Sequence, residues 1–275
     1  MVVQHNLTAM NSNRMLGVTT STQAKSTEKL SSGYKINRAA DDAAGLAISE
    51  KMRRQVRGLT QAVANAQDGI SAVQTAEGAL GEVHDMLQRM NELAVKAGTD
   101  TLQEADRDYI QSEVNALISE IDRVAATTTF NEQALLDGTF TGKKLQVGAE
   151  STATNQINMS IIAMSFSTIA GVVSISVDGA DGTKARASIE VVKTALKAVS
   201  KQRSDLGAVQ NRLEHTVKNL DNVVENTQAA ESQIRDTDMA EEMVRYANNN
   251  VLAQAGQSML AQANQSNQGV LSLLR

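Results

Sequence analysis

Apolar residues recur at every third or fourth position over a long stretch of the N-terminal half of the chain. They are Met52, Val56, Leu59, Val63, Ala66, Ile70, Val73, Ala76, Leu80, Val83, Leu87, Met90 and Ala94. This spacing gives the narrow apolar stripe of a coiled-coil helix. A helix from about Asp42 to Lys96 would be roughly 80 Å long at ~1.5 Å per residue. We therefore expect it to lie along other helices for its whole length.

A second long stripe lies in the C-terminal half, where a helix is predicted to begin near Ser188. Its heptad positions are Val192, Val199, Leu206, Leu213 and Leu220, and Leu196, Val217 and Val224 occupy the other stripe position. A shorter helix is predicted over Glu104–Ala126, after a turn at Gly98-Thr99-Asp100. The pattern predicts a bundle core. Its members are Val56, Leu59, Val63, Ile70, Leu80, Leu87, Val199, Leu206, Leu213 and Leu220.

The middle of the chain has a different pattern. Turn signals occur at Asp137-Gly138, Thr141-Gly142 and Gly148, and residues 178–182 form a further turn signal. Between them, apolar and polar residues alternate as in β-strands, at Ile157/Met159/Ile161 and at Val173/Ile175/Val177. The predicted fold is therefore mainly α: a long antiparallel helical bundle or coiled coil, with a small β-hairpin region at about 135–182.

Both ends of the chain are only weakly amphipathic. Their apolar residues stand among Asn, Ser, Thr and Gln, and isolated helices of this quality are marginal in water. We expect the ends to be disordered in the monomer and to become helical when neighbouring molecules cover them. The residues predicted to mediate this terminal coiled coil and polymerisation are Val3, Leu7, Met10, Val18, Met243, Val251, Leu252, Met259, Leu260, Val270, Leu271 and Leu274.

The composition supports long helices and excludes several classes of protein. The chain has no proline, cysteine or tryptophan. The absence of proline removes the strongest helix breaker, and the absence of cysteine excludes disulfides and thiolate metal sites. Its net charge of −5 and scattered basic residues argue against nucleic-acid binding. No run approaches ~18 apolar residues, so no membrane insertion is expected. The N-terminal segment lacks the basic and apolar regions of a signal peptide, so we expect that, if the protein is exported, it leaves by a route that needs no cleaved signal.

No arrangement of residues predicts catalysis. His5, His84 and His215 have no second metal ligand three or four positions away, so no metal site is expected. One of Asp41 and Asp42 is predicted to cap the helix that begins there. Residues 178–182 faintly resemble a calcium loop but lack the later ligands and the closing Glu, which favours a turn. The sequence therefore predicts a protein that is not an enzyme and has no cofactor.

Both ends of the chain carry a series of longer motifs. They are LSSGYKINRAADDAAGLAI at 30–48, QDGI at 67–70, QTAEGAL at 74–80, LQRMNELAV at 87–95, EIDR at 120–123, TFN at 129–131, LDG at 136–138, SDLGAVQNR at 204–212, AQAN at 261–264 and VLSLLR at 270–275. In this order the motifs resemble those of the bacterial flagellins of the short type. The resemblance covers residues 1–140 and about 185–275, everything except the β-rich middle.

This resemblance implies a function and partners. Residues 1–43 and 236–275 correspond to the terminal coiled coil that forms the inner tube of the flagellar filament, and residues 44–235 to the helical bundle outside it. The chain would leave the bacterium by flagellar type III export and polymerise head-to-tail, as an extracellular filament subunit for swimming motility. The implied partners are copies of itself, an export chaperone, and the hook-associated and cap proteins.

The resemblance also implies recognition by the animal Toll-like receptor for flagellin, through Arg89, Leu93 and Glu113.

Two other functions compete with the filament subunit. A hook–filament junction protein would share the terminal helices, although the complete run of flagellin motifs at both ends disfavours it. A secreted coiled-coil effector or translocator would instead fold on a host partner.

Overall fold

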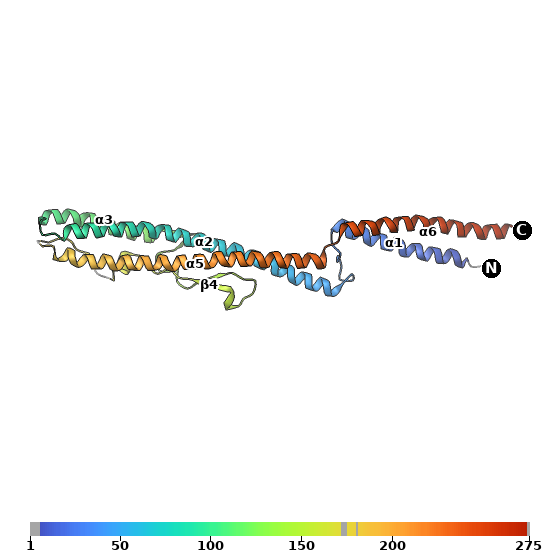
Figure 1. Cartoon of the computed structure of the whole chain (residues 1–275), viewed down its shortest axis with the longest axis horizontal. Helices are drawn as coiled ribbons and strands as arrows, with labels where there is room; N and C mark the ends of the chain where they lie inside the picture. The colour runs from blue at the N-terminus through green and yellow to red at the C-terminus, as the bar shows by residue number, and fades with distance from the viewer. Residues whose placement is uncertain (1–5, 172–174, 180, 274–275) are drawn as a thin grey trace. The chain divides into compact units, whose positions relative to one another are not determined.

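The fold is mainly helical, as the sequence predicted (Figure 1). The computed structural model describes residues 6–171, 175–179 and 181–273, with side chains described as far as 266. The elements are α1 (Leu7–Ser32), α2 (Ala43–Ala97), α3 (Glu104–Thr127), β1 (Thr129–Phe130), β2 (Gln133–Ala134), β3 (Lys143–Gln146), the 3-10 helix η1 (Ala153–Asn155), β4 (Gln156–Met159), α4 (Phe166–Ile169), α5 (Thr183–Arg235) and α6 (Met239–Leu273).

The chain divides into two compact units. Residues 57–224 form one, which we call the bundle unit, and residues 1–56 with 225–275 form the other, the terminal unit. The domain division expected from the sequence falls instead at the breaks between α1 and α2 and between α5 and α6. The compact units divide inside α2 and α5, so the start of α2 and the end of α5 both belong to the terminal unit, where ion pairs join them. These are Arg53–Glu231 at 3.7 Å and Arg235–Glu50 at 2.7 Å.

In the bundle unit, α2 and α5 run antiparallel. Leu59 clusters with Leu220, Ala66 clusters with Leu213, and Glu77 pairs with Arg203 at 3.6 Å, so positions that rise along α2 meet positions that fall along α5. Most of the predicted core residues are buried here: Leu59, Leu80, Leu87, Val199, Leu206, Leu213 and Leu220. The remaining three, Val56, Val63 and Ile70, are only half-buried.

The face of α2 that packs against the β3–β4 hairpin carries small residues. A Cβ added at Gly58 would lie 2.9 Å from the Cβ of Ala149, and one at Gly69 would lie 2.6 Å from Cδ1 of Leu145. Asn65 Nδ2 donates to the carbonyl oxygen of Gln146 at 3.1 Å. A side chain at Gly58 would force the Ala149 backbone to shift, and one at Gly69 would force the Leu145 side chain to move. The apolar stripe in the sequence did not reveal this face, because glycine and alanine carry its packing.

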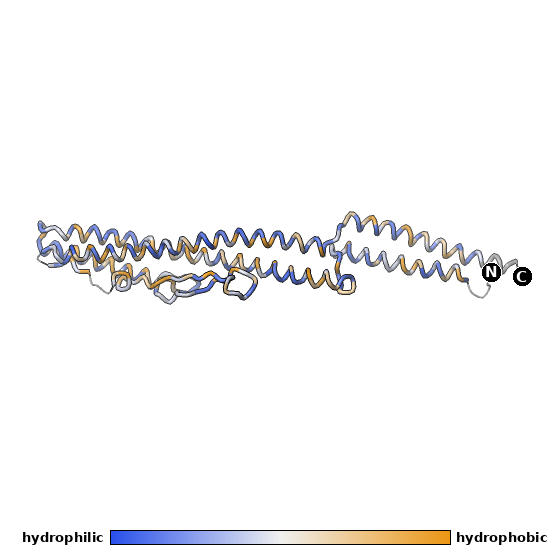
Figure 2. Tube along the Cα trace, turned by 60° about the horizontal axis from the view of Figure 1, so that its bottom comes forward, coloured by the Kyte–Doolittle hydropathy of each residue, from blue (hydrophilic) through white to orange (hydrophobic). Residues whose placement is uncertain are grey.

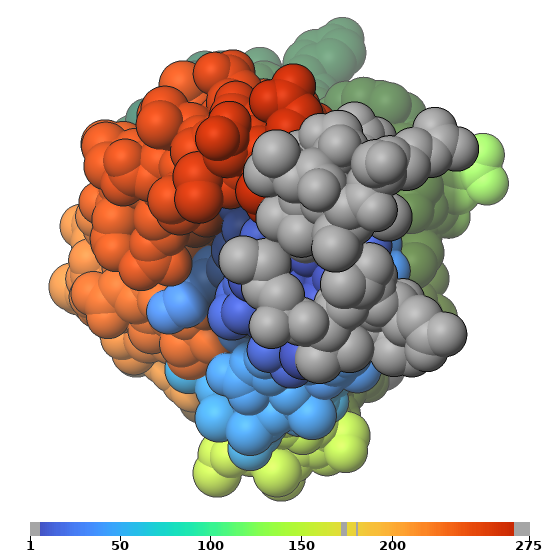
Figure 3. Space-filling model, turned by 90° about the vertical axis from the view of Figure 1, so that its right-hand side faces the viewer, coloured from blue at the N-terminus to red at the C-terminus, as the bar shows by residue number. Residues whose placement is uncertain are grey.

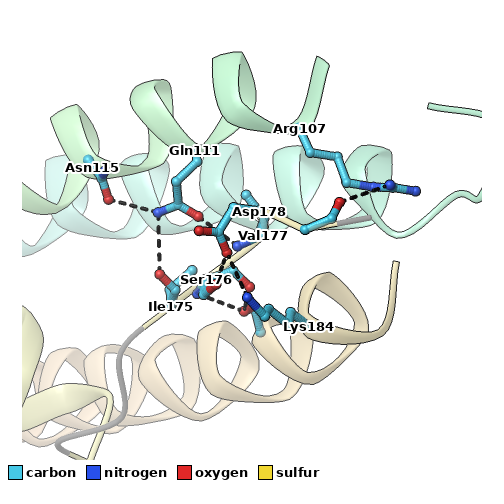
Figure 4. Close-up of polar contacts among 10 residues, drawn as sticks. Arg107, Gln111, Asn115, Ile175, Ser176, Val177, Asp178 and Lys184 are labelled. Atoms are coloured by element: carbon cyan, nitrogen blue, oxygen red, sulfur yellow. Dashed lines mark hydrogen bonds and ion pairs between the residues drawn. The ribbon is translucent and has the colours of Figure 1, made fainter. Parts of the chain in front are cut away.

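The predicted strand at Val173/Ile175/Val177 is wrong over its described part, and Val173 lies outside the described residues. Ile175 and Val177 are buried, but their backbone pairs with side chains and not with another strand (Figure 4). Gln111 Oε1 of α3 accepts from the Val177 N–H at 2.6 Å. Ser188 Oγ of α5 donates to the Ser176 carbonyl at 2.9 Å. The alternation in the sequence reflects burial between two helices, which side-chain hydrogen bonds make possible.

Arg107 ties together the end of the bundle unit where α2 stops. Its side chain is fully buried and donates three hydrogen bonds to carbonyl oxygens: Nε to Ala97 at 3.1 Å, Nη2 to Thr99 at 2.8 Å and Nη1 to Gly179 at 3.1 Å. The last bond is visible in Figure 4. A cation is favourable at the C-terminal end of a helix, where carbonyl groups lack partners. Arg107 therefore caps α2 and fixes the loop that precedes α5.

Candidate assembly surface

The terminal unit is built around α1 and α6, which lie antiparallel (Figure 1). Figure 3 shows α6 in red beside α1 in dark blue, seen from the end that carries the chain termini. Asn6 Nδ2 near the start of α1 donates to the carbonyl oxygen of Ala263 near the end of α6 at 3.0 Å. The side chain of Asn6 also caps α1 by accepting from the Ala9 N–H at 3.0 Å. The first helix ends at Gly33, whose φ of 75° is the left-handed conformation that glycine adopts without strain.

A hydrogen-bonded junction connects the two linkers of the terminal unit. The Lys35 N–H donates to the Arg235 carbonyl at 2.7 Å, and the Thr237 N–H donates to the Gly33 carbonyl at 2.9 Å. The two chain segments thus form a short antiparallel contact, which aligns the start of α6 with the end of α1. The Arg235 guanidinium also lies over the ring of Tyr34.

The Asp41-Asp42 pair serves the start of α2. Asp42 caps the helix by accepting from the Gly45 N–H at 2.9 Å, as the sequence predicted. Asp41 instead accepts from the backbone N–H groups of Arg38 and Asn37, and these hydrogen bonds, the one from Arg38 above all, lower the pKa of Asp41. Both carboxylates therefore stabilise the turn that leads from α1 into α2.

The terminal unit buries few apolar side chains and exposes many, whereas the bundle unit buries most of its apolar side chains. Among the described residues, the buried apolar side chains of the terminal unit are only Ile36 and Ala253, whereas eleven of the fifteen exposed large apolar side chains belong to it. Leu7 on α1 and Val251 on α6 are each 65% exposed. Hydrophobic positions recur along both helices nearest the chain termini (Figure 2). Exposed apolar side chains that gather on one part of a protein are typical of surfaces that bind another protein.

Most of the residues predicted to mediate assembly lie on this surface. The exposed ones are Leu7, Met10, Val18, Met243, Val251, Leu252 and Met259. Leu260 is half-buried. Val3 and Leu274 lie outside the described residues, and Val270 and Leu271 belong to α6 in the part where side chains are not described. The prediction missed Val244, although its position one heptad before Val251 was a usable signal.

A groove runs between α1 and α6 on this surface. It has a volume of about 340 Å³ and is lined by Asn11, Ser12, Met15, Leu16, Thr19, Leu252, Ala255, Gly256 and Met259. Gly256 opens the groove because it has no side chain, and a Cβ there would lie 3.3 Å from Cδ1 of Leu16. A hollow of this kind between two helices has the form that accepts a protruding side chain from a third helix.

The residues predicted to bind the receptor lie in the bundle unit. Arg89 of α2 is half exposed; its Nε bonds Glu113 of α3 at 3.0 Å and its Nη1 bonds Glu92 at 3.1 Å. These two carboxylates, Glu113 first, raise the pKa of Arg89. Leu93 departs from the prediction, because it is only 3% exposed and packs in the bundle core. The exposed part of the predicted site is therefore the Arg89–Glu113 ion pair.

Within the described part of the chain, no group of His, Asp and Glu side chains is arranged to hold a metal ion. In the same part of the chain, no helix is both long enough and apolar enough to cross a lipid bilayer.

Comparison with known proteins decides the family. The profile of the bacterial flagellin N-terminal helical region matches residues 3–141, and that of the bacterial flagellin C-terminal helical region matches residues 189–274. The chain belongs to the bacterial flagellin family. It is 54% identical over 275 residues to a flagellin of Halalkalibacterium halodurans, with 100% of both chains covered. It is 49% identical over 288 residues to the flagellar filament 31.3 kDa core protein of Treponema maltophilum, again with both chains fully covered.

Solved structures agree with this assignment. The crystal structure of Bacillus cereus flagellin is 28% identical, with a TM-score of 0.50 over 57% of this chain and 88% of that one. A putative flagellar hook-associated protein from Vibrio parahaemolyticus shares the fold, with a TM-score of 0.61 at 13% identity over 71% of this chain and 100% of that one. This flagellin-family chain is a structural protein of the flagellar filament and not an enzyme.

Proposed function

We propose that the chain polymerises head-to-tail into the flagellar filament used for swimming, and that α1 and α6 supply the principal contacts between subunits. The observation that carries the proposal is the concentration of exposed apolar side chains on the unit that has the thinnest core. Burying ~400 Å² of apolar surface per subunit would contribute about 10 kcal/mol before the ordering entropy is subtracted. Repeating one such contact by a helical operation gives an open filament.

Seeded elongation with a charged variant tests this proposal. Val251→Glu would place a carboxylate in the proposed interface, whereas Gln254→Glu puts the same charge on a neighbouring exposed polar position of α6. An unpaired buried charge costs several kcal/mol, so Val251→Glu should slow elongation on filament fragments by at least about tenfold. Electron microscopy and sedimentation measure the product. Equal elongation of Val251→Glu and wild type would contradict the proposal.

We further propose that residues 1–43 and 236–275 form the inner tube of that filament and gain their full order only on assembly. The thin core of the terminal unit supports this, because few buried contacts hold α1 and α6 against local unfolding. Amide exchange should be fast along both helices in dilute monomer and slow in the filament. Removal of residues 236–275 should leave a soluble chain that keeps the bundle folded and does not polymerise.

The proposed route to the filament follows from membership of the family. The chain would leave the bacterium through the flagellar type III export apparatus, without a cleaved signal peptide, and would meet an export chaperone and the hook-associated and cap proteins. The weakly packed terminal unit suits such export, because a chain that is threaded through a channel must unfold at low cost. Deletion of the export apparatus should retain the full-length chain inside the cell; its release without that apparatus would contradict this route.

We also propose that the bundle unit is recognised by the animal Toll-like receptor for flagellin, through the exposed Arg89–Glu113 pair. Arg is favoured at binding hot spots, and Arg89 is held in place by two carboxylates from α2 and α3. Arg89→Ala should weaken binding of the purified receptor ectodomain at least about tenfold. Arg123→Ala is the matched control, because Arg123 is similarly exposed, at 60% against 52% for Arg89, and pairs with Glu120. Unchanged affinity for Arg89→Ala would contradict this proposal.

A further inference from the structure

The methionines of the chain are sorted by exposure between the two units. Five described methionines are exposed, and all five belong to the terminal unit: Met10, Met15, Met239, Met243 and Met259. Three are buried almost completely, and all three belong to the bundle unit: Met90, Met159 and Met164. Met52 of the terminal unit and Met86 of the bundle unit are half-buried. Among the described methionines, the most accessible thioethers therefore lie on the unit that carries the proposed assembly contacts.

Two of the exposed methionines meet in the groove between α1 and α6. Met15 comes from α1 and Met259 from α6, and both line the hollow that Gly256 leaves open. Met15 is 56% exposed and Met259 is 62% exposed, so a small oxidant reaches both sulfur atoms in the lone chain. Leu16, Leu252 and Ala255 supply the apolar part of the remaining lining, and Asn11, Ser12 and Thr19 supply its polar groups. A neighbouring subunit that fills the groove would cover both thioethers.

We propose that the Met15–Met259 groove is an oxidative modification site, at which hydrogen peroxide or another hydroperoxide converts the thioethers to sulfoxides and thereby blocks addition of the subunit to the filament. This inference rests on the proposed function and adds a form of regulation to the same surface. The growing end of the filament would then add unoxidised subunits in preference to oxidised ones.

The chemistry is a two-electron oxygen transfer. A lone pair of the methionine sulfur attacks one oxygen of hydrogen peroxide, the O–O bond breaks and an S–O bond forms. The departing hydroxide takes the proton of the transferred oxygen, so the peroxide is reduced to water as the sulfur is oxidised. Methionine sulfoxide reductase reverses the change.

The physical effect on assembly follows from the polarity of the product. A sulfoxide is a strong hydrogen-bond acceptor, whereas a thioether is a weak one. Thr19 has its hydroxyl engaged with the Met15 carbonyl at 3.0 Å, so this donor of the groove lining is already used. A thioether gains from apolar burial, whereas a sulfoxide that a neighbouring subunit covers gives up its hydrogen bonds to water. Each sulfoxide should therefore reduce elongation by about tenfold. In the filament the covered thioethers should instead be protected from the oxidant.

The test uses the full-length chain, hydrogen peroxide as the oxidant and filament fragments as seeds. Peptide mass spectrometry should show that Met15 and Met259 of the monomer oxidise at least about tenfold faster than Met90, Met159 and Met164, as their exposure requires. The same two residues should react at least about tenfold more slowly in the filament than in the monomer. Equal rates in monomer and filament would overturn the inference.

Two pairs of variants locate the effect. Met15→Leu/Met259→Leu keeps the groove apolar and removes its thioethers, and Met10→Leu/Met243→Leu removes one exposed thioether from each helix outside the groove. After peroxide treatment, the control variant and wild type, which keep both groove thioethers, should lose about tenfold or more in elongation rate, whereas the groove variant should lose at least about threefold less than either. Equal loss in the groove variant overturns the inference.

Two further measurements separate the possible failures. Circular dichroism of the oxidised monomer should remain within error of the untreated chain, because Met90, Met159 and Met164 are buried in the bundle core; a loss of helix would overturn the proposed mechanism. Reductase treatment should restore elongation, and failure to restore it in protein shown to be reduced would also overturn it. If untreated wild-type protein does not elongate filament fragments, both the proposed function and this inference are contradicted.

Discussion

The guanidinium of Arg235, at the end of α5, lies 4.8 Å above the centre of the Tyr34 ring in the linker between α1 and α2. The same guanidinium pairs with Glu50 of α2 at 2.7 Å, and the Arg235 side chain is only 12% exposed. One side chain thus joins the end of α5, the start of α2 and the linker that leads back to α1. Cation–π contact and a partly buried ion pair reinforce each other at this point.

Arg235→Ala should loosen the junction of the terminal unit. Loss of the ring contact and the ion pair should cost about 1–2 kcal/mol, which corresponds to roughly tenfold faster amide exchange at the junction. Hydrogen exchange of the Lys35 and Thr237 amides in the monomer measures the effect, because both amides bond across the two linkers. Arg245→Ala is the control, because its partner Glu241 lies within α6. Unchanged exchange in Arg235→Ala would show that the junction does not depend on this side chain.

Arg107→Met should destabilise the bundle unit. The substitution keeps much of the apolar stem but removes three hydrogen bonds to backbone carbonyl groups, which then lie buried without these donors. The expected loss is about 3 kcal/mol in the free energy of unfolding. Urea denaturation of the full-length monomer measures it. Arg123→Met, at an exposed arginine of the same helix, should change stability by less than about 0.5 kcal/mol. Similar losses in the two variants would contradict the role assigned to Arg107.

Glu132→Gly should stabilise the β1–β2 hairpin. The two turn residues, Asn131 and Glu132, have φ of 48° and 62°, and the pairing of Phe130 with Gln133 makes this a two-residue turn. Such turns favour glycine, and a non-glycine residue in the left-handed region costs about 1–2 kcal/mol. After the greater chain entropy of glycine is subtracted, the gain should be up to about 1 kcal/mol. Thermal unfolding of the monomer measures it, with Glu150→Gly in an exposed loop as the comparison. A lower melting temperature for Glu132→Gly would contradict the assignment of strain to this turn.

The stability of the bundle unit should fall at acid pH, in part through Asp100. The Arg186 guanidinium, at 2.8 Å, and secondly the Gly182 N–H hold the pKa of this carboxyl below its ordinary value. A depressed pKa contributes stability above the pKa of the unfolded chain, near 3.9, and this contribution disappears as the pH falls through the lower folded value. Asp100→Asn should therefore be less stable than wild type at neutral pH and flatter in its response below about pH 4. Parallel stability curves for the two chains in acid would contradict this account.

The long helices could be predicted closely because several local signals agree. The stripe from Met52 to Ala94, the capping carboxylate of Asp42 and the turn at Gly98 together gave a helix within one residue of α2 at each end. The antiparallel partner followed from the heptad leucines of α5. Both elements are determined by periodicity and capping, which are properties of short stretches of sequence.

The remaining features depend on contacts that the sequence does not display. The alternation at Ile175 and Val177 predicted a strand, but side chains from α3 and α5 bond that backbone. The motif containing Leu93 did not indicate that its side chain faces the core. Of the candidate assembly surface, the composition of α1 and α6 predicted the apolar side chains, whereas the groove around Gly256 required the pairing of two helices that lie at opposite ends of the chain.

A filament reconstruction at side-chain resolution tests the central claim most directly. The account predicts that Leu7, Met10 and Val18 of α1, with Val251, Leu252 and Met259 of α6, lie within about 4.5 Å of apolar atoms of neighbouring subunits. Contacts that leave these six side chains facing solvent, with the subunits joined through the bundle units alone, would contradict it.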